Sequence, residues 1–178
     1  NFYSVLKSTA AEHLHFALLT GVSKYGKISI FSDLNNLLDL TLDRRFATLL
    51  GYTQAELEHY FADRIDRLAQ TYAMSRSAML AMIAHWYNGY SWDAVTSVYV
   101  PFSTLVFLEQ QTFTNHWFIT GTPTFLVKQL HKRQVAAYEL EGVIADTKLL
   151  NSADVNSIDI YSLLFQTGYL TIKRTWLG

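Results

Sequence analysis

The sequence predicts a mainly α-helical chain with a few strands, which is the composition of a fragment of an α/β fold. Apolar residues recur at three- and four-residue spacing through the middle of the chain, as on the buried face of a helix. Shorter runs near both ends alternate or cluster apolar residues as strands do. With 178 residues, 50% of them hydrophobic, the chain is long enough for one domain or two small subdomains.

The first fifty residues predict one strand between helical and loop segments. Residues 1–12 are expected to be the end of a helix, and residues 13–20, which are mostly apolar, a buried strand. Residues 33–41 are expected to be a loop with room for a short helix. Residues 42–50 predict another short helix, which Gly51 ends.

The clearest helix follows Thr53, because Thr53 and Glu56 have the spacing of a capping box. A second helix is expected to start at Ser75 or Ser77 and to run to Tyr87. The first of these helices takes its buried face from residues at helical spacing, which are Leu57, Phe61, Ile65, Leu68 and Tyr72.

The remaining elements are three helices and a final strand. Pro101 suits the first turn of a helix that runs to Glu109. Thr122 and Pro123 predict the N-cap and first residue of a helix that ends near Lys132. The last helix opens at Ser157 or Asp159 and ends near Gly168, and residues 169–176 alternate like a strand.

Composition excludes several classes of function. The chain has no cysteine, which rules out disulfides, thiolate metal sites and a cysteine nucleophile. The formal net charge of −1 gives no overall electrostatic signature of a nucleic-acid binder, although a local basic patch is compatible with it. No apolar run reaches the length of a membrane span and no signal peptide opens the chain, so we expect a cytoplasmic protein.

The segment Gly21–Lys27 has the spacing of a phosphate-binding loop, but the match is incomplete. Gly21, Gly26 and Lys27 fit the pattern G-x-x-x-x-G-K. The next position must be a serine or threonine that binds the magnesium of the nucleotide, and here it is Ile28. The loop should also open a helix, whereas the following residues alternate like a strand. Lys27 is therefore not expected to grip a phosphate.

Five blocks of sequence resemble the AAA-ATPase-like family of bacterial proteins, whose members often carry a PD-(D/E)XK nuclease-like domain at the C-terminus. The blocks come in the family's order and cover nearly the whole chain. They are Thr20–Thr41, Gly51–Leu57, Trp86–Tyr90, Trp117–Leu126 and Leu164–Ile172.

The resemblance implies a division into three parts and names the parts that this chain lacks. Residues 1–40 correspond to the C-terminal part of the P-loop ATPase core, 41–110 to a helical lid, and 111–178 to a helical, winged-helix-like module. The true phosphate loop and the acidic strand of the family precede Asn1, and the nuclease-like domain follows Gly178. These missing parts are the expected partners, together with a second copy of the chain, because its apolar surplus suits self-association.

The resemblance also implies where nucleotide would be sensed. Thr20 and Ser23 fall in the sensor-1-like segment, where a polar side chain senses the terminal phosphate or positions the attacking water. Ser23, Lys24 and Arg45 are the candidates for nucleotide contact, Arg45 as a sensor-2 arginine or arginine finger. Turn chemistry and solvated helix faces explain the same residues equally well. ATP and magnesium are expected in the intact parent, and no cofactor in this chain alone.

Four other groups of residues have ordinary structural explanations beside functional ones. The polar cluster Asp33, Asn35, Asn36 and Asp39 suits helix caps or a ligand, and the aromatic block Trp86–Trp92 suits lid core or nucleotide stacking. His13 and His15 share a strand face without a third metal ligand. Asp146 and Lys148 resemble the end of a nuclease D-x-K motif, but no aspartate lies between Asp93 and Asp146 to supply the preceding metal ligand.

Two alternatives to an ATPase segment remain open from the sequence. One is a protein-interaction module, in which the apolar surplus binds a partner. The other is a winged-helix nucleic-acid-binding domain built from the last helix and the strand over residues 169–176. Because the phosphate loop is incomplete, the chain alone is expected to be inactive as an enzyme.

Overall fold

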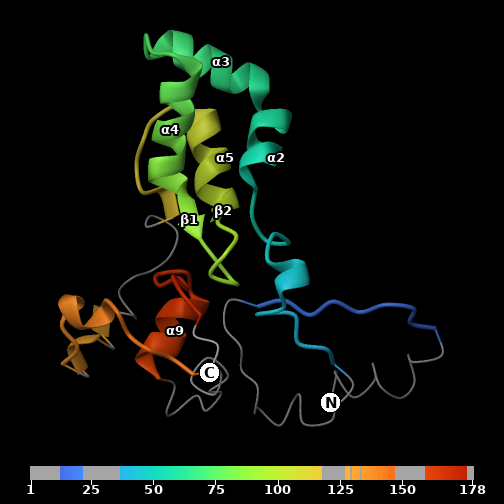
Figure 1. The fold of residues 1–178 in the computed structure, drawn as a ribbon, viewed down its shortest axis with the longest axis vertical. Coiled ribbons are helices and arrows are strands. Elements are labelled where there is room, and N and C mark those ends of the chain that lie inside the picture. The colour runs from blue at the N-terminus through green and yellow to red at the C-terminus, as the bar shows by residue number, and fades with distance from the viewer. Residues whose placement is uncertain are drawn as a thin grey trace. The chain divides into compact units, whose positions relative to one another are not determined.

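The computed structural model describes residues 13–21, 37–117, 127–128, 130–132, 134–146 and 159–175. The chain divides into two compact units, one formed by residues 1–38 and 125–170 and the other by residues 39–124 and 171–178. The described residues are mainly helical, with one two-stranded sheet among them. Figure 1 shows the helices and strands of the described residues.

The second unit holds most of the helices. In Figure 1, α4 and α5 lie side by side and α3 crosses beyond them at the end remote from the strands. Its elements are the 3-10 helix η1 (Arg44–Phe46), α2 (Gln54–Tyr60), α3 (Ala62–Thr71), α4 (Arg76–Tyr87), β1 (Asn88–Tyr90), β2 (Val98–Tyr99) and α5 (Pro101–Gln110).

The predicted helix starts are confirmed. The Thr53 hydroxyl accepts from the Glu56 N–H at 3.2 Å, and the Glu56 carboxylate accepts from the Thr53 N–H at 2.8 Å, which completes the capping box. Ser75, and not Ser77, caps α4 by accepting from the Ala78 N–H. Pro101 occupies the first turn of α5, where its missing N–H costs nothing.

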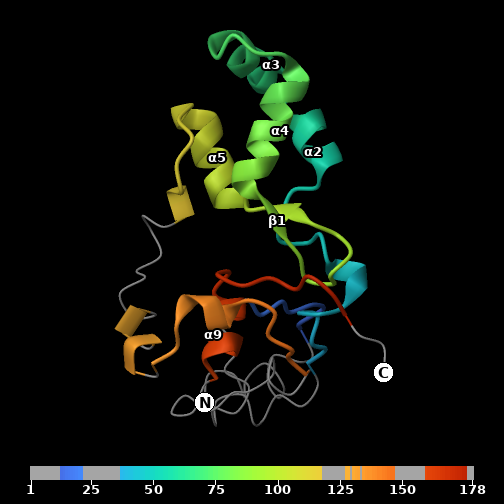
Figure 2. The ribbon, with the colours of Figure 1, turned by 60° about the vertical axis from the view of Figure 1, so that its left-hand side comes forward.

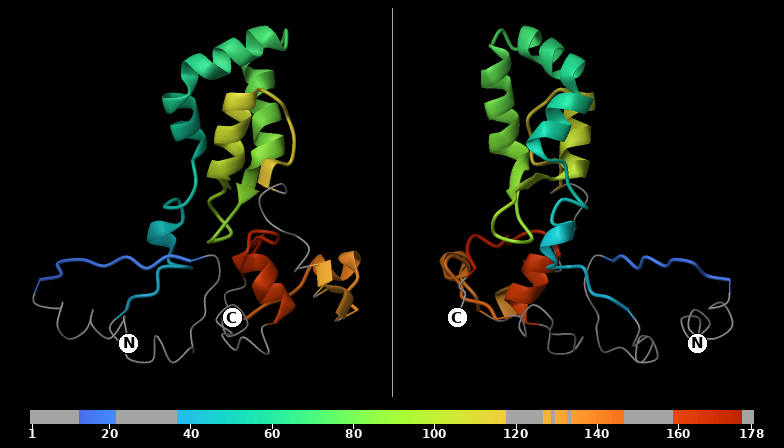
Figure 3. Two further views of the ribbon diagram at one scale, coloured as in Figure 1. Left: turned by 180° about the vertical axis from the view of Figure 1, so that it is seen from behind. Right: turned by 45° about the vertical axis from the view of Figure 1, so that its right-hand side comes forward.

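The helix predicted after Thr53 is broken into α2 and α3 at Phe61. The backbone of Phe61 leaves the helical region (φ −117°, ψ 19°), and its ring packs edge-on against Tyr52 with centroids 5.5 Å apart. Leu57, Ile65 and Leu68 are buried as the spacing predicts. The break preserves that spacing, because the Phe61 N–H still donates to the Leu57 carbonyl and the Phe61 carbonyl still accepts from Ile65. Figure 3 shows α3 bridging from α2 to α4 from two sides.

One apolar core holds these helices together, and burying its side chains is the main favourable term in the unit's stability. Aromatic rings fill its α5 side: Phe107 stacks on Phe113 with centroids 4.2 Å apart, and Tyr87 lies 5.3 Å from Phe107. The buried members are Leu57, Ile65, Leu68, Ala69, Met79, Ile83, Tyr87, Tyr99, Phe107 and Leu108.

The short antiparallel sheet closes the end of this core. In Figure 2, β1 continues directly from α4. Asn88 pairs with Tyr99 and Tyr90 with Val98, with an irregularity between the two pairs. Tyr52 adds an isolated bridge to Tyr99, with N–H···O bonds of 3.2 and 2.8 Å between the two backbones. The segment before α2 is therefore fixed to the hairpin.

The loop between β1 and β2 is organised by the carboxylate of Asp93. Its Oδ1 accepts from the N–H groups of Val95 at 2.9 Å and Thr96 at 2.7 Å, and its Oδ2 accepts from the Thr96 hydroxyl at 3.2 Å. The neighbouring Ser91 is joined to the C-terminal segment, because its N–H donates to the Thr171 hydroxyl at 2.7 Å and its carbonyl accepts from that hydroxyl.

Acidification is expected to loosen this loop. The backbone N–H of Thr96, then that of Val95, holds the pKa of Asp93 below its usual 3.8. The carboxylate therefore stabilises the folded state above about pH 4, and this contribution is lost as the pH falls through the depressed pKa. We expect an NMR titration to place the Asp93 midpoint below 3.8. Asp93→Asn should flatten the acid limb of the stability–pH curve, and an unchanged limb would contradict the assignment.

The first unit has its own small core around α9 (Ile160–Gln166). Asp159 caps α9, with its Oδ1 accepting from the N–H groups of Tyr161 and Ser162, so the second of the two predicted starts is confirmed. Residues 127–128 and 130–132 are helical, within the helix predicted to end near Lys132. A 3-10 helix, η2 (Ala137–Leu140), precedes α9.

Three predicted elements are wrong. Residues 13–20 form no strand and are exposed throughout, because no described strand pairs with them. Residues 169–175 form no strand either, and their backbone instead runs on from the end of α9. The helix predicted over 42–50 is reduced to η1 followed by turns. The helix predicted for residues 1–12 and the N-cap Thr122 lie outside the described residues.

Candidate functional site

Of the sequence-predicted nucleotide residues, the structure describes Thr20 and Arg45, which belong to different units. Thr20 is exposed in the irregular segment 13–21. Ser23 and Lys24 lie outside the described residues, as does Lys27. Arg45 lies on η1 in the second unit, whereas Thr20 belongs to the first.

Arg45 is held by its neighbour Asp43. Its Nε donates to the two Asp43 oxygens at 3.0 and 3.1 Å and its Nη2 to Oδ2 at 2.6 Å, and the same carboxylate caps η1 by accepting from the Arg45 N–H. These bonds lower the pKa of Asp43 and raise that of Arg45. The guanidinium also lies 5.6 Å from the centroid of the Phe46 ring. A phosphate would therefore have to compete with Asp43 for Arg45.

Several other candidates from the sequence have structural roles or are exposed, as far as the structure describes them. Asp39 accepts from the N–H and hydroxyl of Thr41, while Asp33, Asn35 and Asn36 lie outside the described residues. In the aromatic block, Tyr87 is buried core. Over the described ranges, no three His, Asp or Glu side chains gather as a metal site would require, and His13 and His15 are both exposed.

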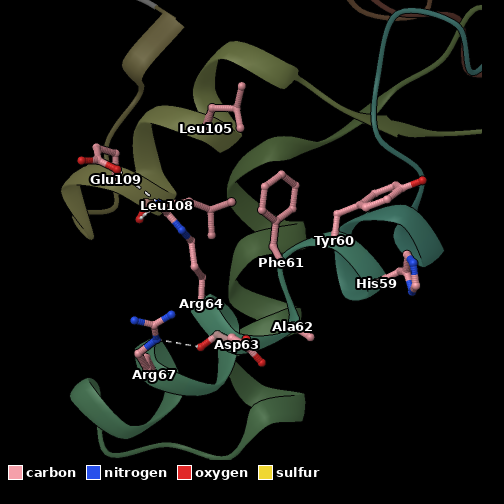
Figure 4. A pocket seen from close by; sticks show the side chains of 10 residues that line it. All are labelled: His59, Tyr60, Phe61, Ala62, Asp63, Arg64, Arg67, Leu105, Leu108 and Glu109. Carbon is pink, nitrogen blue, oxygen red and sulfur yellow. Dashed lines mark hydrogen bonds and ion pairs between the residues drawn. The ribbon is translucent and has the colours of Figure 1, made fainter.

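A groove with a volume of about 620 Å³ lies elsewhere, between the α2–α3 break and α5. Figure 4 shows Phe61, Leu105 and Leu108 gathered at its centre and charged side chains of α3 along its edge. A smaller hollow of about 250 Å³ adjoins it and shares four of its residues. The main groove is lined by His59, Tyr60, Phe61, Ala62, Asp63, Arg64, Arg67, Leu105, Leu108 and Glu109.

Arg64 links α3, on one side of the groove, to the C-terminal end of α5. Its Nη1 donates to the Glu109 carboxylate at 3.2 Å and to the Leu108 carbonyl at 3.4 Å. The Tyr72 hydroxyl donates to the Gln111 carbonyl just beyond. Carbonyls at the end of a helix lack partners within the helix, so both side chains satisfy groups that α5 leaves open.

Asp63 and Arg67 line the groove, and their charged groups form no ion pair with any described residue. Arg67 donates through Nε to the Asp63 carbonyl at 3.2 Å, and no described residue accepts from its Nη atoms. The Asp63 carboxylate likewise has no bonded partner among the described residues. The sequence alone did not single out these residues. Their four-residue spacing was a usable signal, but the α5 side of the groove lies far from them in sequence.

Comparisons with known proteins give one informative match. The chain matches no protein-family model and no solved structure. It is 42% identical over 174 residues to a protein from Azotobacter chroococcum mcd 1 described as an uncharacterized protein in the vnfD 5′ region. The match covers 98% of this chain but 31% of that relative. The chain therefore spans less than a third of the relative's length.

In the parts that the structure describes, no helix has the length and apolarity to cross a bilayer.

Proposed function

We propose that the chain is the lid-bearing segment of a longer AAA-ATPase-like protein, and that the intact protein binds ATP with magnesium and hydrolyses it. Two features support this proposal. The five blocks that resemble the family run in order along the chain. Residues 41–110, which correspond to the lid, fall wholly within the second unit, where α2 to α5 share one core.

The observation that carries the proposal is the state of residues 13–20. This run is apolar and strand-like in sequence, yet its side chains are exposed, Phe16 by 77%. Its backbone makes no hydrogen bond to any described residue. Apolar side chains that stay exposed to water are unfavourable, and an extended backbone without partners is available for pairing with another strand. A core sheet supplied by chain outside this match would satisfy both, and more than two thirds of the relative lies outside the match.

In such an assembly Thr20 ends the run that enters the core, which is where the family places its sensor-1 residue. Ser23 and Lys24 follow it in sequence, close enough for the same loop to present them to nucleotide. Arg45, whose side chain is 72% exposed, would bind phosphate in place of Asp43. Among the candidate groups, Thr20 and Ser23 would orient the attacking water and Arg45 would stabilise charge on the phosphoryl group.

ATP hydrolysis by the intact protein tests the proposal. We expect magnesium-dependent turnover by the full-length relative and none by the 178-residue chain. At the equivalent positions, Ser23→Ala and Thr20→Ala should lower kcat about 10²-fold, the usual loss when one preorganised polar group is removed. Thr48→Ala, an exposed threonine outside the segment, is the matched control. Absence of ATP binding and turnover in the full-length protein would overturn the proposal.

A protein-interaction module is the second candidate, favoured by further exposed apolar residues in the second unit, among them Leu49, Leu50 and Val95. On this hypothesis nucleotide is irrelevant, and the longer protein would bind a partner without binding ATP. The winged-helix alternative has lost its support from the sequence, because the strand that it needs is absent from residues 169–175. Salt-sensitive DNA binding would nevertheless revive it.

A further inference from the structure

Over residues 101–106, α5 buries its polar side chains and exposes apolar ones. Ser103 and Thr104 are fully buried, and the Ser103 hydroxyl has no hydrogen-bond partner in the described structure. Phe102 and Leu105, by contrast, leave 47% and 44% of their surface exposed. A helix whose outer face is also apolar is typical of one that packs against neighbours on both sides.

The exposed side chains of α5 continue into the groove between α5 and the α2–α3 break. Phe102 and Leu105 are one helical turn apart and therefore lie on one side of the helix, and Leu105 also lines the groove. Figure 4 shows Leu105 and Tyr60 on either side of Phe61, and Tyr60 is 68% exposed. We call Phe102, Leu105 and Tyr60 the apolar patch. Exposed apolar side chains that lie together in this way mark a surface that binds another segment or protein.

The C-terminal segment is held close to the start of α5. The Ser91 N–H donates to the Thr171 hydroxyl at 2.7 Å, and the same hydroxyl donates to the Ser91 carbonyl at 3.2 Å. Ser91 follows β1, whose Tyr90 pairs with Val98 on β2, and β2 leads into α5. An extended chain spans up to about 3.5 Å per residue, so roughly ten residues beyond Thr171 are enough to reach Phe102.

We propose that the apolar patch is covered by the polypeptide that follows Gly178 in the longer protein. More than two thirds of the relative lies outside the match, so the longer protein has chain to form a second layer over α5. Residues 171–178 belong to the same unit as α5, whereas residues 1–38 belong to the other unit. The polypeptide that continues from Gly178 therefore starts within reach of the patch.

The chemistry of the covering segment follows from what it meets. It is apolar where it contacts Phe102 and Leu105, because removing these side chains from water makes the contact favourable. At the edge of the groove it meets Asp63 and Arg67, whose charged groups form no ion pair with any described residue. Side chains of opposite charge can therefore border the apolar contact. The inference rests on the part of the proposed function that makes this chain a segment of a longer protein, and it does not depend on ATP.

Site-specific photocross-linking in the full-length protein tests the proposal. Phe102→p-benzoylphenylalanine keeps an aromatic side chain on the apolar patch, and irradiation joins that side chain to whatever lies against it. Mass spectrometry then identifies the joined peptide, and we expect a peptide of the same molecule from the sequence after Gly178. The matched control is Gln70→p-benzoylphenylalanine, at an exposed position of α3 outside the patch, which should not give this product.

Thiol labelling in the full-length protein measures the cover independently, and the 178 residues contribute no cysteine of their own. Iodoacetamide should alkylate Leu105→Cys about tenfold more slowly than Gln70→Cys, because a covered thiol is inaccessible to the reagent. Each rate is read from the peptide that carries the site. Equal rates at the two positions, no cross-link from Phe102, a cross-link to sequence before Asn1, or a cross-link between two molecules would each overturn the proposal.

The outcome is distinguishable from that of the proposed function. A full-length protein that neither binds nor hydrolyses ATP, but gives the expected cross-link, would overturn the ATPase proposal and support this one. Magnesium-dependent turnover of ATP without the cross-link would do the reverse.

Discussion

Replacing Phe107 by alanine is expected to lower the free energy of unfolding of the second unit by about 3–5 kcal/mol, the usual cost of removing a buried aromatic ring. Phe107 is fully buried. It stacks on Phe113 and lies 5.3 Å from Tyr87, so its loss removes the centre of the aromatic cluster. Urea unfolding followed by far-ultraviolet circular dichroism measures the change.

Phe102→Ala is the matched control for this prediction. Phe102 lies on the same helix, α5, and leaves 47% of its surface exposed. Its replacement should cost much less, because little apolar area returns to water. Equal losses at the two positions would mean that Phe107 does not lie in a tight core.

The second large effect is expected at Gly51. A Cβ added to Gly51 would lie 2.5 Å from the Cβ and Cγ2 of Val98 and 3.1 Å from the Tyr99 carbonyl oxygen. Both neighbours belong to β2, which is fixed by its pairing with Asn88 and Tyr52. Gly51→Ala should therefore force the backbones apart and destabilise the unit by about 1–3 kcal/mol, the typical cost of overpacking.

A double-mutant cycle separates this clash from a general effect of losing glycine. Val98→Gly removes both crowded atoms, Cβ and Cγ2, and combined with Gly51→Ala it should cost less than the sum of the two single changes. Simple additivity, or a Gly51→Ala variant as stable as the natural sequence, would contradict the close contact between these two backbones.

The helices of the second unit were predictable because their signals are local. The cap at Thr53, the serine before α4 and the proline of α5 each act within a few residues of the chain. The break at Phe61 was not predictable from spacing, since the hydrogen bonds across it keep the apolar face continuous. Local capping and periodicity therefore determine where helices lie more firmly than where they bend.

The strands failed for a different reason. A strand needs a neighbour for its backbone, and the alternation at 13–20 and 169–176 carries no information on whether that neighbour exists. The groove could not be predicted from local sequence either, because the residues that meet across it, such as Arg64 and Glu109, are 45 residues apart. Of the candidate site, the sequence shows the charge pair Asp63 and Arg67, but the apolar centre beside it depends on how α5 packs.

The anchoring of α5 by Arg64 and Tyr72 has a consequence for the speed of association. The Arg64 side chain on α3 and the Tyr72 side chain at the end of α3 donate to the last carbonyls of α5. The two helices beside the groove, α3 and α5, are therefore already joined before anything binds. A surface whose two sides are already joined needs little rearrangement when a partner binds. We therefore expect binding in this groove to follow a single kinetic phase, with a rate set by diffusion and orientation.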